Sequence, residues 1–145
     1  MEVDDIQGYR KLEVFNAAYE LSLELHRMTR ERFPHHEQTE LGSQIRRASK
    51  SIALNIAEGY GKRSLSKREF AKYLFIAMGS ADELAVELEF CRDLGYVSKE
   101  EYEVLADRVN KIGRQIRHAG KATNRIPTMI ERFERRATSD ELREW

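Results

Sequence analysis

The stretch that decides the fold is LGSQIRRASKSIALNIAEGYG, residues 41–61. Its large apolar residues recur at steps of three and four, which places them along one side of a helix: Leu41, Ile45, Ala48, Ile52 and Ile56. A neighbouring side carries small residues, which allow a second helix to approach closely: Ser49, Ala53 and Ala57. Gly59 and Gly61 close the run, as expected where a helix ends on a left-handed residue. The stretch therefore predicts one amphipathic helix with a core seam.

Three further helices follow from similar patterns. The segment before Phe33-Pro34 carries apolar or small positions at alternating gaps of three and four, and proline disfavours helical geometry in the residue before it. Ser66-x-x-Glu69 and Ser98-x-x-Glu101 are capping boxes that begin the two later helices. We expect the four helices at about residues 9–30, 37–58, 66–94 and 99–119. Short connections between long helices predict an all-α, antiparallel up-and-down four-helix bundle.

A chain of 145 residues is long enough for one domain with its own core. We divide it into an N-terminal arm (1–8), the bundle (9–120) and a C-terminal extension (121–145). The extension contains a short amphipathic pattern that predicts a helical appendage: Ile126, Met129, Ile130 and Phe133. Residues 70–78 are apolar nearly all round, so this part of the third helix needs cover on two sides, from the fold or from another subunit.

The composition narrows the function classes. The chain is 41% hydrophobic and 34% charged, and its longest apolar run, residues 73–78, is far shorter than the roughly 20 residues of a membrane span. The first residues, MEVDDIQ, lack the pattern of a secretory signal. A single cysteine, Cys91, excludes an internal disulfide and suits a reducing compartment. We expect a cytoplasmic protein without a membrane segment.

The net charge is zero, but the charges are unevenly distributed. Residues 43–72 carry eight Lys/Arg against two acids, and residues 82–103 carry eight acids against two Lys/Arg. Residues 108–125 carry six Lys/Arg and no acid. In an up-and-down bundle the end of the second helix, the start of the third and the last half of the fourth lie at the same end. The basic clusters therefore predict a phosphate-binding surface there.

The predicted phosphate contacts come from three segments, and Tyr60 and Tyr73 are nearby aromatics that can stack on bases. The contacts are Arg46, Arg47, Lys50, Lys62, Arg63, Lys67, Arg68, Arg114, Arg117 and Lys121. A solvated charged face with intramolecular pairs is the alternative interpretation. Asn55 lies among apolar positions, so we expect it to be a buried polar pin for helix register. Its expected partners are Glu58, Ser80 and Glu37.

The sequence favours no enzyme class, cofactor or metal. No histidine has a glutamate three residues before it, which argues against a di-metal bundle site, and His36 with Glu40 is only a lone pair. Arg30 and His35 have a spacing used by small helical RNases, but Phe33-Pro34 lies between them. Gly59-x-Gly61-Lys62 lacks the preceding strand of a phosphate loop, so we interpret it as a helix end and turn. Cys91 is expected to fill the core.

Several motifs along the chain resemble those of a known family. They are Phe33-Pro34-x-x-Glu37, Leu41-x-x-Gln44-Ile45-Arg46-Arg47-Ala48, Ser51-Ile52, Asn55-Ile56-Ala57-Glu58-Gly59, Glu69-Phe70 and Gly79-Ser80-x-x-Glu83-Leu84. Over about residues 9–119 the chain resembles the bacterial four-helix-bundle proteins encoded in intervening sequences of 23S ribosomal RNA genes. Arg46, Arg47, Asn55 and Glu58 are carried over as matched positions without a catalytic role.

The resemblance implies an antiparallel bundle that assembles into a homopentameric ring without enzymatic activity. It also implies similarity to the accessory variability protein of diversity-generating retroelements, a pentamer that binds nucleic acid and a reverse transcriptase. Our leading hypothesis is thus a non-enzymatic oligomer that binds RNA or DNA as an accessory to a reverse transcriptase or an RNA-processing machine. The alternatives are a protein-interaction scaffold without nucleic acid and a small RNase whose activity needs His35.

Overall fold

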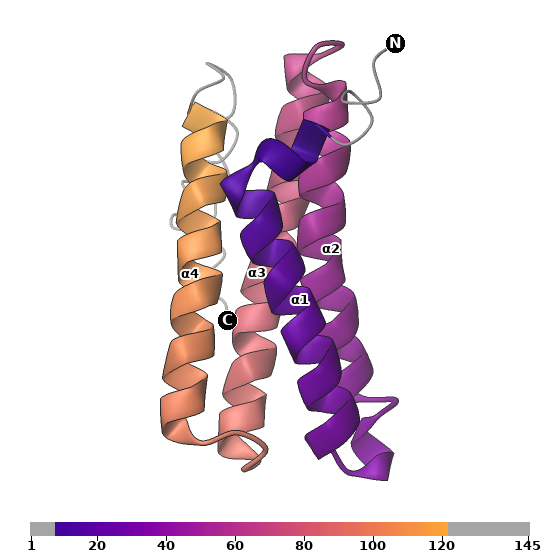
Figure 1. Ribbon diagram of the computed structural model, residues 1–145, viewed down its shortest axis with the longest axis vertical. Helices are drawn as coiled ribbons and strands as arrows, with labels where there is room; N and C mark the ends of the chain where they lie inside the picture. The colour runs from indigo at the N-terminus through magenta and orange to yellow at the C-terminus, as the bar shows by residue number, and fades with distance from the viewer. Residues whose placement is uncertain (1–7, 122–145) are drawn as a thin grey trace, which may run out of the picture.

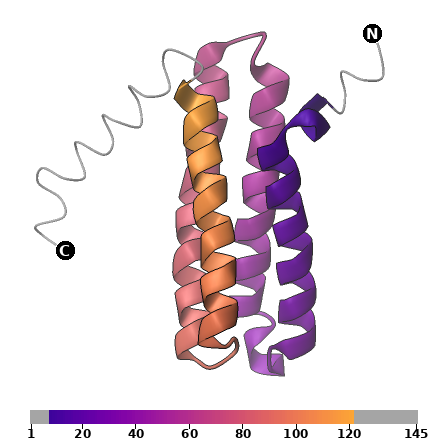
Figure 2. The same cartoon turned by 60° about the vertical axis from the view of Figure 1, so that its left-hand side comes forward.

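The computed structural model describes residues 8–121, apart from the side chain of Lys121, and this part of the chain is entirely helical (Figure 1). Its elements in chain order are the 3₁₀ helix η2 (Gly8–Lys11), α1 (Glu13–Arg32), the 3₁₀ helix η3 (His35–Glu37), α2 (Leu41–Lys62), α3 (Lys67–Asp93) and α4 (Lys99–Lys121). Successive α-helices run in opposite directions, side by side (Figure 2). The predicted four-helix bundle is therefore confirmed.

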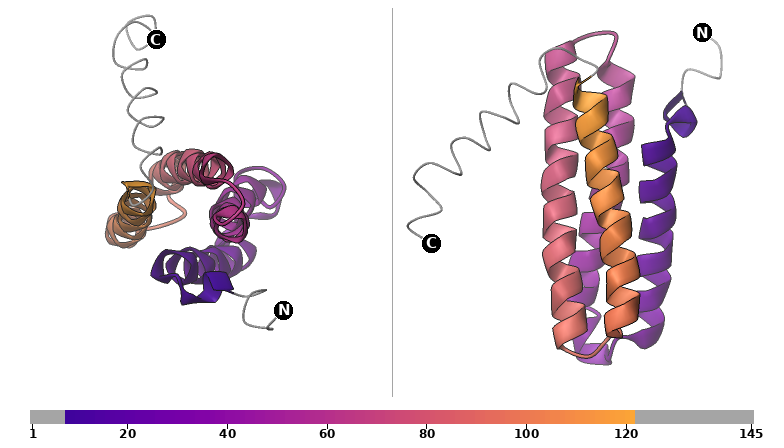
Figure 3. Two further views of the ribbon diagram at one scale, coloured as in Figure 1. Left: turned by 90° about the horizontal axis from the view of Figure 1, so that it is seen from above. Right: turned by 90° about the vertical axis from the view of Figure 1, so that its left-hand side faces the viewer.

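One core runs along the bundle and takes side chains from all four helices. Viewed from above, α1 lies beside α2 and α4 lies beside α3, around this shared interior (Figure 3). The seam predicted in residues 41–56 lies in the core, because its apolar positions are all buried. The largest fully buried apolar side chains are Leu21, Leu25, Ile45, Ile52, Ile56, Leu74, Leu84, Leu88, Ile112 and Ile116.

The connection between α1 and α2 is longer than the sequence indicates. α1 ends at Arg32, and the side chain of Gln38 donates hydrogen bonds to the carbonyl oxygens of Thr29 (2.7 Å) and Phe33 (3.0 Å). The last turn of α1 would otherwise leave such carbonyls without partners. Gln38 therefore caps the end of α1 instead of belonging to α2. The chain forms η3 and then a turn, and α2 begins at Leu41 rather than near residue 37.

The prediction that Gly59 and Gly61 end the second helix is wrong. α2 continues to Lys62, and among the described residues only Gly95 has a positive φ, 81°. Gly59 is buried inside the helix, where an added Cβ would lie 3.0 Å from the Cβ of Tyr73 and 3.2 Å from the Phe70 ring. Gly59 therefore allows α2 and α3 to approach closely. The same result overturns our interpretation of Gly59-x-Gly61-Lys62 as a turn.

The two predicted serine caps are present at the starts of α3 and α4. Ser66 Oγ accepts a hydrogen bond from the Glu69 backbone N–H (3.2 Å), and Ser98 Oγ accepts one from the Glu101 N–H (3.0 Å). The backbone N–H of Ser66 donates to the Lys62 carbonyl oxygen, so it does not depend on the side chain of Glu69 as a full capping box would require. Both helix starts are thus fixed by local sequence.

The apolar stretch 70–78 of α3 is mostly covered by the bundle, with Tyr73, Phe75 and Met78 half-buried. Phe70, Ala71, Leu74 and Ala77 are buried, whereas Ile76 is 40% exposed. Further along α3, three more large apolar side chains on the same side of the helix are about half exposed: Val86, Phe90 and Leu94. We call these four exposed residues the α3 stripe. Within residues 8–121 the bundle thus covers the apolar residues of 70–78 apart from Ile76, and it leaves the rest of the α3 stripe exposed. In residues 8–121 no helix is long and apolar enough to cross a membrane.

Candidate nucleic-acid interface

Basic residues from two separate segments lie at one end of the bundle. The connection from α2 to α3 and the C-terminal half of α4 both lie at this end (Figure 2). We call the predicted contacts found there the basic end: Lys62, Arg63, Lys67, Arg68, Arg114 and Arg117. The α3–α4 connection lies at the opposite end, which we call the acidic end, and it is flanked by Asp93, Glu100, Glu101 and Glu103. Asp93 is paired there with Arg92, and Glu101 with Arg32. Lys121 ends α4, and its side chain is not described.

The residues of the basic end differ in how far they are already engaged. Lys67 and Arg68 are exposed in the first turn of α3. The guanidinium carbon of Arg63 lies 3.5 Å from the ring centroid of Tyr60, and its Nη1 donates to the Tyr60 carbonyl oxygen at 2.6 Å. Arg63 thus covers Tyr60 from one side, and the Cβ of Tyr73 lies against Gly59. The stacking of bases on these two tyrosines stays a prediction.

The three predicted contacts on α2 do not lie at the basic end. Arg47 precedes Lys62 by fifteen residues on α2, which is about 22 Å along the axis at about 1.5 Å per residue. Arg47 and Lys50 are exposed and border a shallow surface hollow of about 570 Å³ that also includes Asn55 and Glu58. The predicted contact residues therefore form two groups, and the expectation of one continuous surface from three segments is wrong for α2.

Arg46 is part of the internal structure of the bundle. Its guanidinium donates to Thr29 Oγ1 of α1 at 2.9 Å and to the carbonyl oxygen of Gln38 at 2.6 Å. Burial, and then the positive charge of Arg30, lower its pKa from the usual value. Arg46 thus connects α1, the η3 turn and α2, so a change at this residue alters folding as well as surface charge.

Asn55 is half-buried and belongs to a chain of hydrogen bonds between α2 and α3. Its Nδ2 donates to the Ser51 carbonyl oxygen (2.8 Å) and to Ser51 Oγ (3.1 Å), and Ser51 Oγ lies 2.8 Å from Ser80 Oγ. The expected link to Ser80 thus runs through Ser51. Of the other expected partners, Glu58 is exposed, and Glu37 accepts instead from the Tyr96 hydroxyl at 2.8 Å.

A buried carboxyl group on α3 was missed by the sequence analysis. Glu87 is 5% exposed, and its Oε2 is buried without a hydrogen-bond partner. Burial, and then a hydrogen bond with Glu83 and its charge, raise the pKa of Glu87 to about 8. The sequence contains a pattern that indicates this group. Glu87 lies four residues after Glu83, so the two carboxyl groups share a helix face, and it is next to the core residue Leu88.

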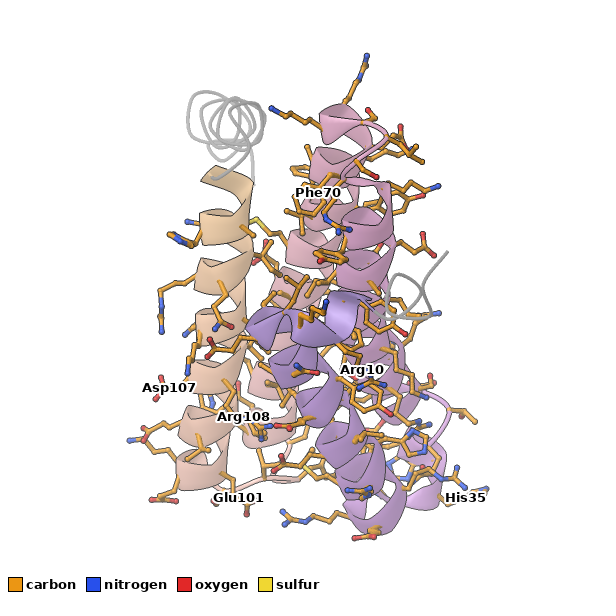
Figure 4. All side chains as sticks on the ribbon, turned by 45° about the horizontal axis from the view of Figure 1, so that its top comes forward. Arg10, His35, Phe70, Glu101, Asp107 and Arg108 are labelled. Carbon is orange, nitrogen blue, oxygen red and sulfur yellow. The ribbon has the colours of Figure 1, made fainter. Side chains whose placement is uncertain are left out.

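The remaining candidates for chemistry are a cysteine, two histidines and Arg30. Within residues 8–121 no group of three His, Cys, Asp or Glu side chains is arranged to hold a metal ion. Cys91 is fully buried, and burial raises its pKa to about 12, so it fills the core as predicted. His35 and His36 are exposed in η3 at the end of the bundle (Figure 4). Arg30 is exposed on the last turns of α1.

The sequence analysis also missed an aromatic cluster near the start of α1. The rings of Tyr9, Phe15 and Tyr19 pack in sequence, and the guanidinium carbon of Arg10 lies 4.5 Å from the centroid of Tyr19. Figure 4 shows Arg10 on the side of the bundle where α1 crosses α2. The helical rhythm of residues 9–30 predicted Phe15 and either Ala18 or Tyr19 as core positions, and the structure buries Phe15 and Ala18 while Tyr19 is 37% exposed.

The family model for the 23S rRNA-intervening sequence protein matches residues 10–118. The chain belongs to this family. Among solved structures, this chain is similar to a protein of unknown function from the S23 ribosomal protein family of Bacteroides thetaiotaomicron VPI-5482. The TM-score is 0.66 at 23% identity, over 73% of this chain and 93% of that one. No curated protein matches.

Membership in the 23S rRNA-intervening sequence protein family confirms the resemblance found in the sequence and indicates no catalytic class. The solved structure is too distant in sequence to carry more than the fold. The matched range ends at residue 118, so the C-terminal extension at 121–145 lies outside it. Its predicted amphipathic helix also lies outside the described residues.

Proposed function

We propose that this chain is a non-enzymatic, oligomeric, cytoplasmic protein that binds RNA or DNA as an accessory to a reverse transcriptase or an RNA-processing machine. The family's name links its members to ribosomal RNA genes, which is in keeping with a nucleic-acid partner. The observation that carries the proposal is the polarity of the bundle. With a net charge of zero, the chain still gathers six of its predicted phosphate contacts at the basic end, where the α2–α3 connection and the C-terminal half of α4 lie.

This polarity favours a polyanion as the ligand. A protein that neutralises phosphates releases condensed counterions, and that release drives binding without any base-specific contact. Lys67 and Arg68 project from the exposed start of α3, and Arg114 and Arg117 belong to α4 of the same bundle end. We therefore expect binding to depend weakly on sequence and strongly on salt. The acidic end would repel the same ligand and so orient it.

Assembly into a ring would multiply this surface. The α3 stripe exposes four large apolar side chains on one side of a helix, which is unusual for a monomer. Cover by neighbouring copies would bury the stripe and bring several basic ends together. A homopentamer, as the family resemblance implies, is the assembly we propose.

The test compares two lysines in equivalent positions. Lys67 and Lys99 are both exposed, and each is the first residue of a helix that follows a serine cap. Lys67 lies at the basic end and Lys99 at the acidic end. In a gel shift with a short RNA duplex, Lys67→Glu is expected to weaken binding severalfold and Lys99→Glu to leave it unchanged. Equal effects of the two reversals, or none, would contradict the proposal.

The α3 stripe also favours a second candidate, a protein-interaction scaffold without nucleic acid. The two functions differ in a pull-down from lysate with and without nuclease. A partner that persists after complete nuclease digestion, together with no gel shift by the purified chain, would support the scaffold. A partner lost with the nucleic acid would support the leading proposal.

A further inference from the structure

An apolar groove is lined by residues of η2, the first half of α1 and the second half of α2. Its volume is about 380 Å³, at the low end of the range of roughly 300–1,000 Å³ that is typical of small-molecule sites. Leu54 (62% exposed) and Leu23 (38% exposed) line it although the bundle core does not need them. The groove is thus large enough to hold a planar ring.

One wall of the groove is aromatic and carries a cation. The rings of Phe15 and Tyr19 are inclined by 23° with centroids 5.9 Å apart, and Tyr9 meets Phe15 edge-on at 4.6 Å. Arg10 is exposed and lies over Tyr19, whereas Phe15 is buried, so the parts of this wall open to a ligand are the Arg10 guanidinium and the exposed part of Tyr19. The Arg10 backbone carbonyl accepts a hydrogen bond from Asn16 Nδ2 at 2.8 Å. Aromatic rings and guanidinium planes are the groups on which proteins stack unpaired bases.

Gly8 and Tyr60 hold this wall in place. An added Cβ at Gly8 would lie 2.9 Å from the Tyr60 ring, so η2 rests directly on α2 at this point. Tyr60, which the sequence suggested as a stacking residue, instead supports the segment that carries Tyr9 and Arg10. The wall is therefore part of the folded bundle.

The groove continues into a cationic surface. Lys50 and Leu54 line both this groove and the hollow that contains Arg47. The side chain of His26 is half-buried and lies close enough to the same cations for them to affect its pKa. Burial lowers the pKa of His26, and after burial the causes are positive neighbours on α1 and α2: Lys50, Arg46, Arg30 and Arg27. A ligand lying along this path would meet an apolar, aromatic site next to a row of cations.

We propose that the groove between α1 and α2 binds unpaired bases of a single-stranded nucleic acid, with Lys50 and Arg47 contacting its phosphates. The inference rests on the proposed function and makes it more specific. A duplex keeps its bases stacked inside and offers only phosphates, so it reaches the basic end but cannot fill the apolar groove. A single strand offers an unpaired base and a phosphate in every nucleotide, so it can reach the groove and the cations beside it together.

The test uses the full chain and uncharged substitutions, so that a change in net charge does not contribute. Leu54→Ser and Tyr19→Ser alter the groove, and Val104→Ser is the control, because Val104 is equally exposed (61%) on α4. The probes are fluorescein-labelled oligouridylate, oligothymidylate and a duplex of the same length. Stacking of one base is expected to make the groove variants about tenfold weaker for both single strands, with duplex binding unchanged.

The outcomes separate this inference from the proposed function. Groove variants that bind single strands like the wild type, while Lys67→Glu loses binding, would overturn the groove and leave the proposed function standing. A fall in oligomer mass in Leu54→Ser would also overturn it, because another copy would then cover the groove. A wild-type chain that binds none of the three probes would overturn both. Cross-links from a 4-thiouridine strand to residues 9–19 would support the groove directly.

Discussion

Neighbouring arginines on α2 have different roles. Arg46 is half-buried and bonds to Thr29 and Gln38, whereas Arg47 is exposed. We expect Arg46→Met to lower the free energy of unfolding by about 1–3 kcal/mol, because it removes charged hydrogen bonds and leaves their buried acceptors unpaired. Arg47→Met, its control, should stay within about 0.5 kcal/mol. Urea unfolding of both variants measures the difference, and equal midpoints would contradict the bracing role of Arg46.

Glu87 should make the stability of the bundle depend on pH. Its folded pKa is about 8, above the usual value of 4.5, so the folded state holds a proton that the unfolded state has already lost. The free energy of unfolding therefore falls as pH rises between these values. Glu87→Gln is neutral throughout, so its stability relative to the wild type should increase from about pH 5 to pH 8 and then level off.

The control for Glu87 is Glu89→Gln, an exposed position on the same helix, which should follow the wild-type pH dependence. Urea unfolding in a series of buffers measures all three chains. If Glu87→Gln lost stability with rising pH as steeply as the wild type, the buried carboxyl group would not be the cause.

Hydrogen bonds between residues close in the sequence were predictable, whereas hydrogen bonds between different helices were not. The bond from Asn55 to Ser51 joins residues four apart on one helix, and the sequence placed Asn55 correctly as a structural polar group. Its link to Ser80 depends on the register of α2 against α3. The different roles of Arg46 and Arg47 depend on Gln38, whose position follows from the η3 turn. The sequence contains no local signal for that turn.

Glycines show the same limit at the scale of elements. The sequence indicated Gly59 as a helix end because glycine is common there. The structure instead explains a glycine at this position by the close packing of Tyr73 and Phe70 from the next helix. Helix starts were predicted better, because Ser66 and Ser98 bond to residues only three positions away. The prediction that the apolar stretch of α3 takes a second cover from another subunit stays a prediction.

A comparison of two glycines tests the close packing of α2 and α3. Gly59→Ala should destabilise the bundle by about 1–3 kcal/mol, because the new Cβ meets Tyr73 and Phe70 at 3.0–3.2 Å. Gly113→Ala on α4 meets nothing within 4 Å, so better helix propensity should stabilise by about 0.5–1 kcal/mol. In thermal or urea unfolding, the change in the free energy of unfolding should therefore have opposite signs in the two variants. A gain in both variants would mean that Gly59 does not limit the helix spacing.

For the whole molecule, the α3 stripe predicts assembly. Phe90→Asp places a charge on the stripe, so it should reduce the mass measured by light scattering to that of one protomer. Val104→Asp changes an equally exposed valine on α4 and should leave the mass unchanged. A wild type that is already monomeric, or a Phe90→Asp variant that assembles normally, would contradict the proposed ring.

The order of the helices was predictable because the connections are short, and this order brings the α2–α3 connection and the C-terminal half of α4 to the same end. The position of Arg46, Arg47 and Lys50 away from that end was not predicted. The groove between α1 and α2 was not predictable. Its aromatic residues fit the helical rhythm of a core, and only the packed bundle shows that Tyr19 and Leu54 remain exposed.

The most direct test of the central claim is the salt dependence of nucleic-acid binding by the wild type and Lys67→Glu. A plot of log affinity against log salt concentration has a slope of about −0.9 per duplex phosphate contact. We predict a steep negative slope for the wild type and a shallower one, by about one contact per protomer, for Lys67→Glu. A wild-type affinity that does not change between low and high salt would contradict the account.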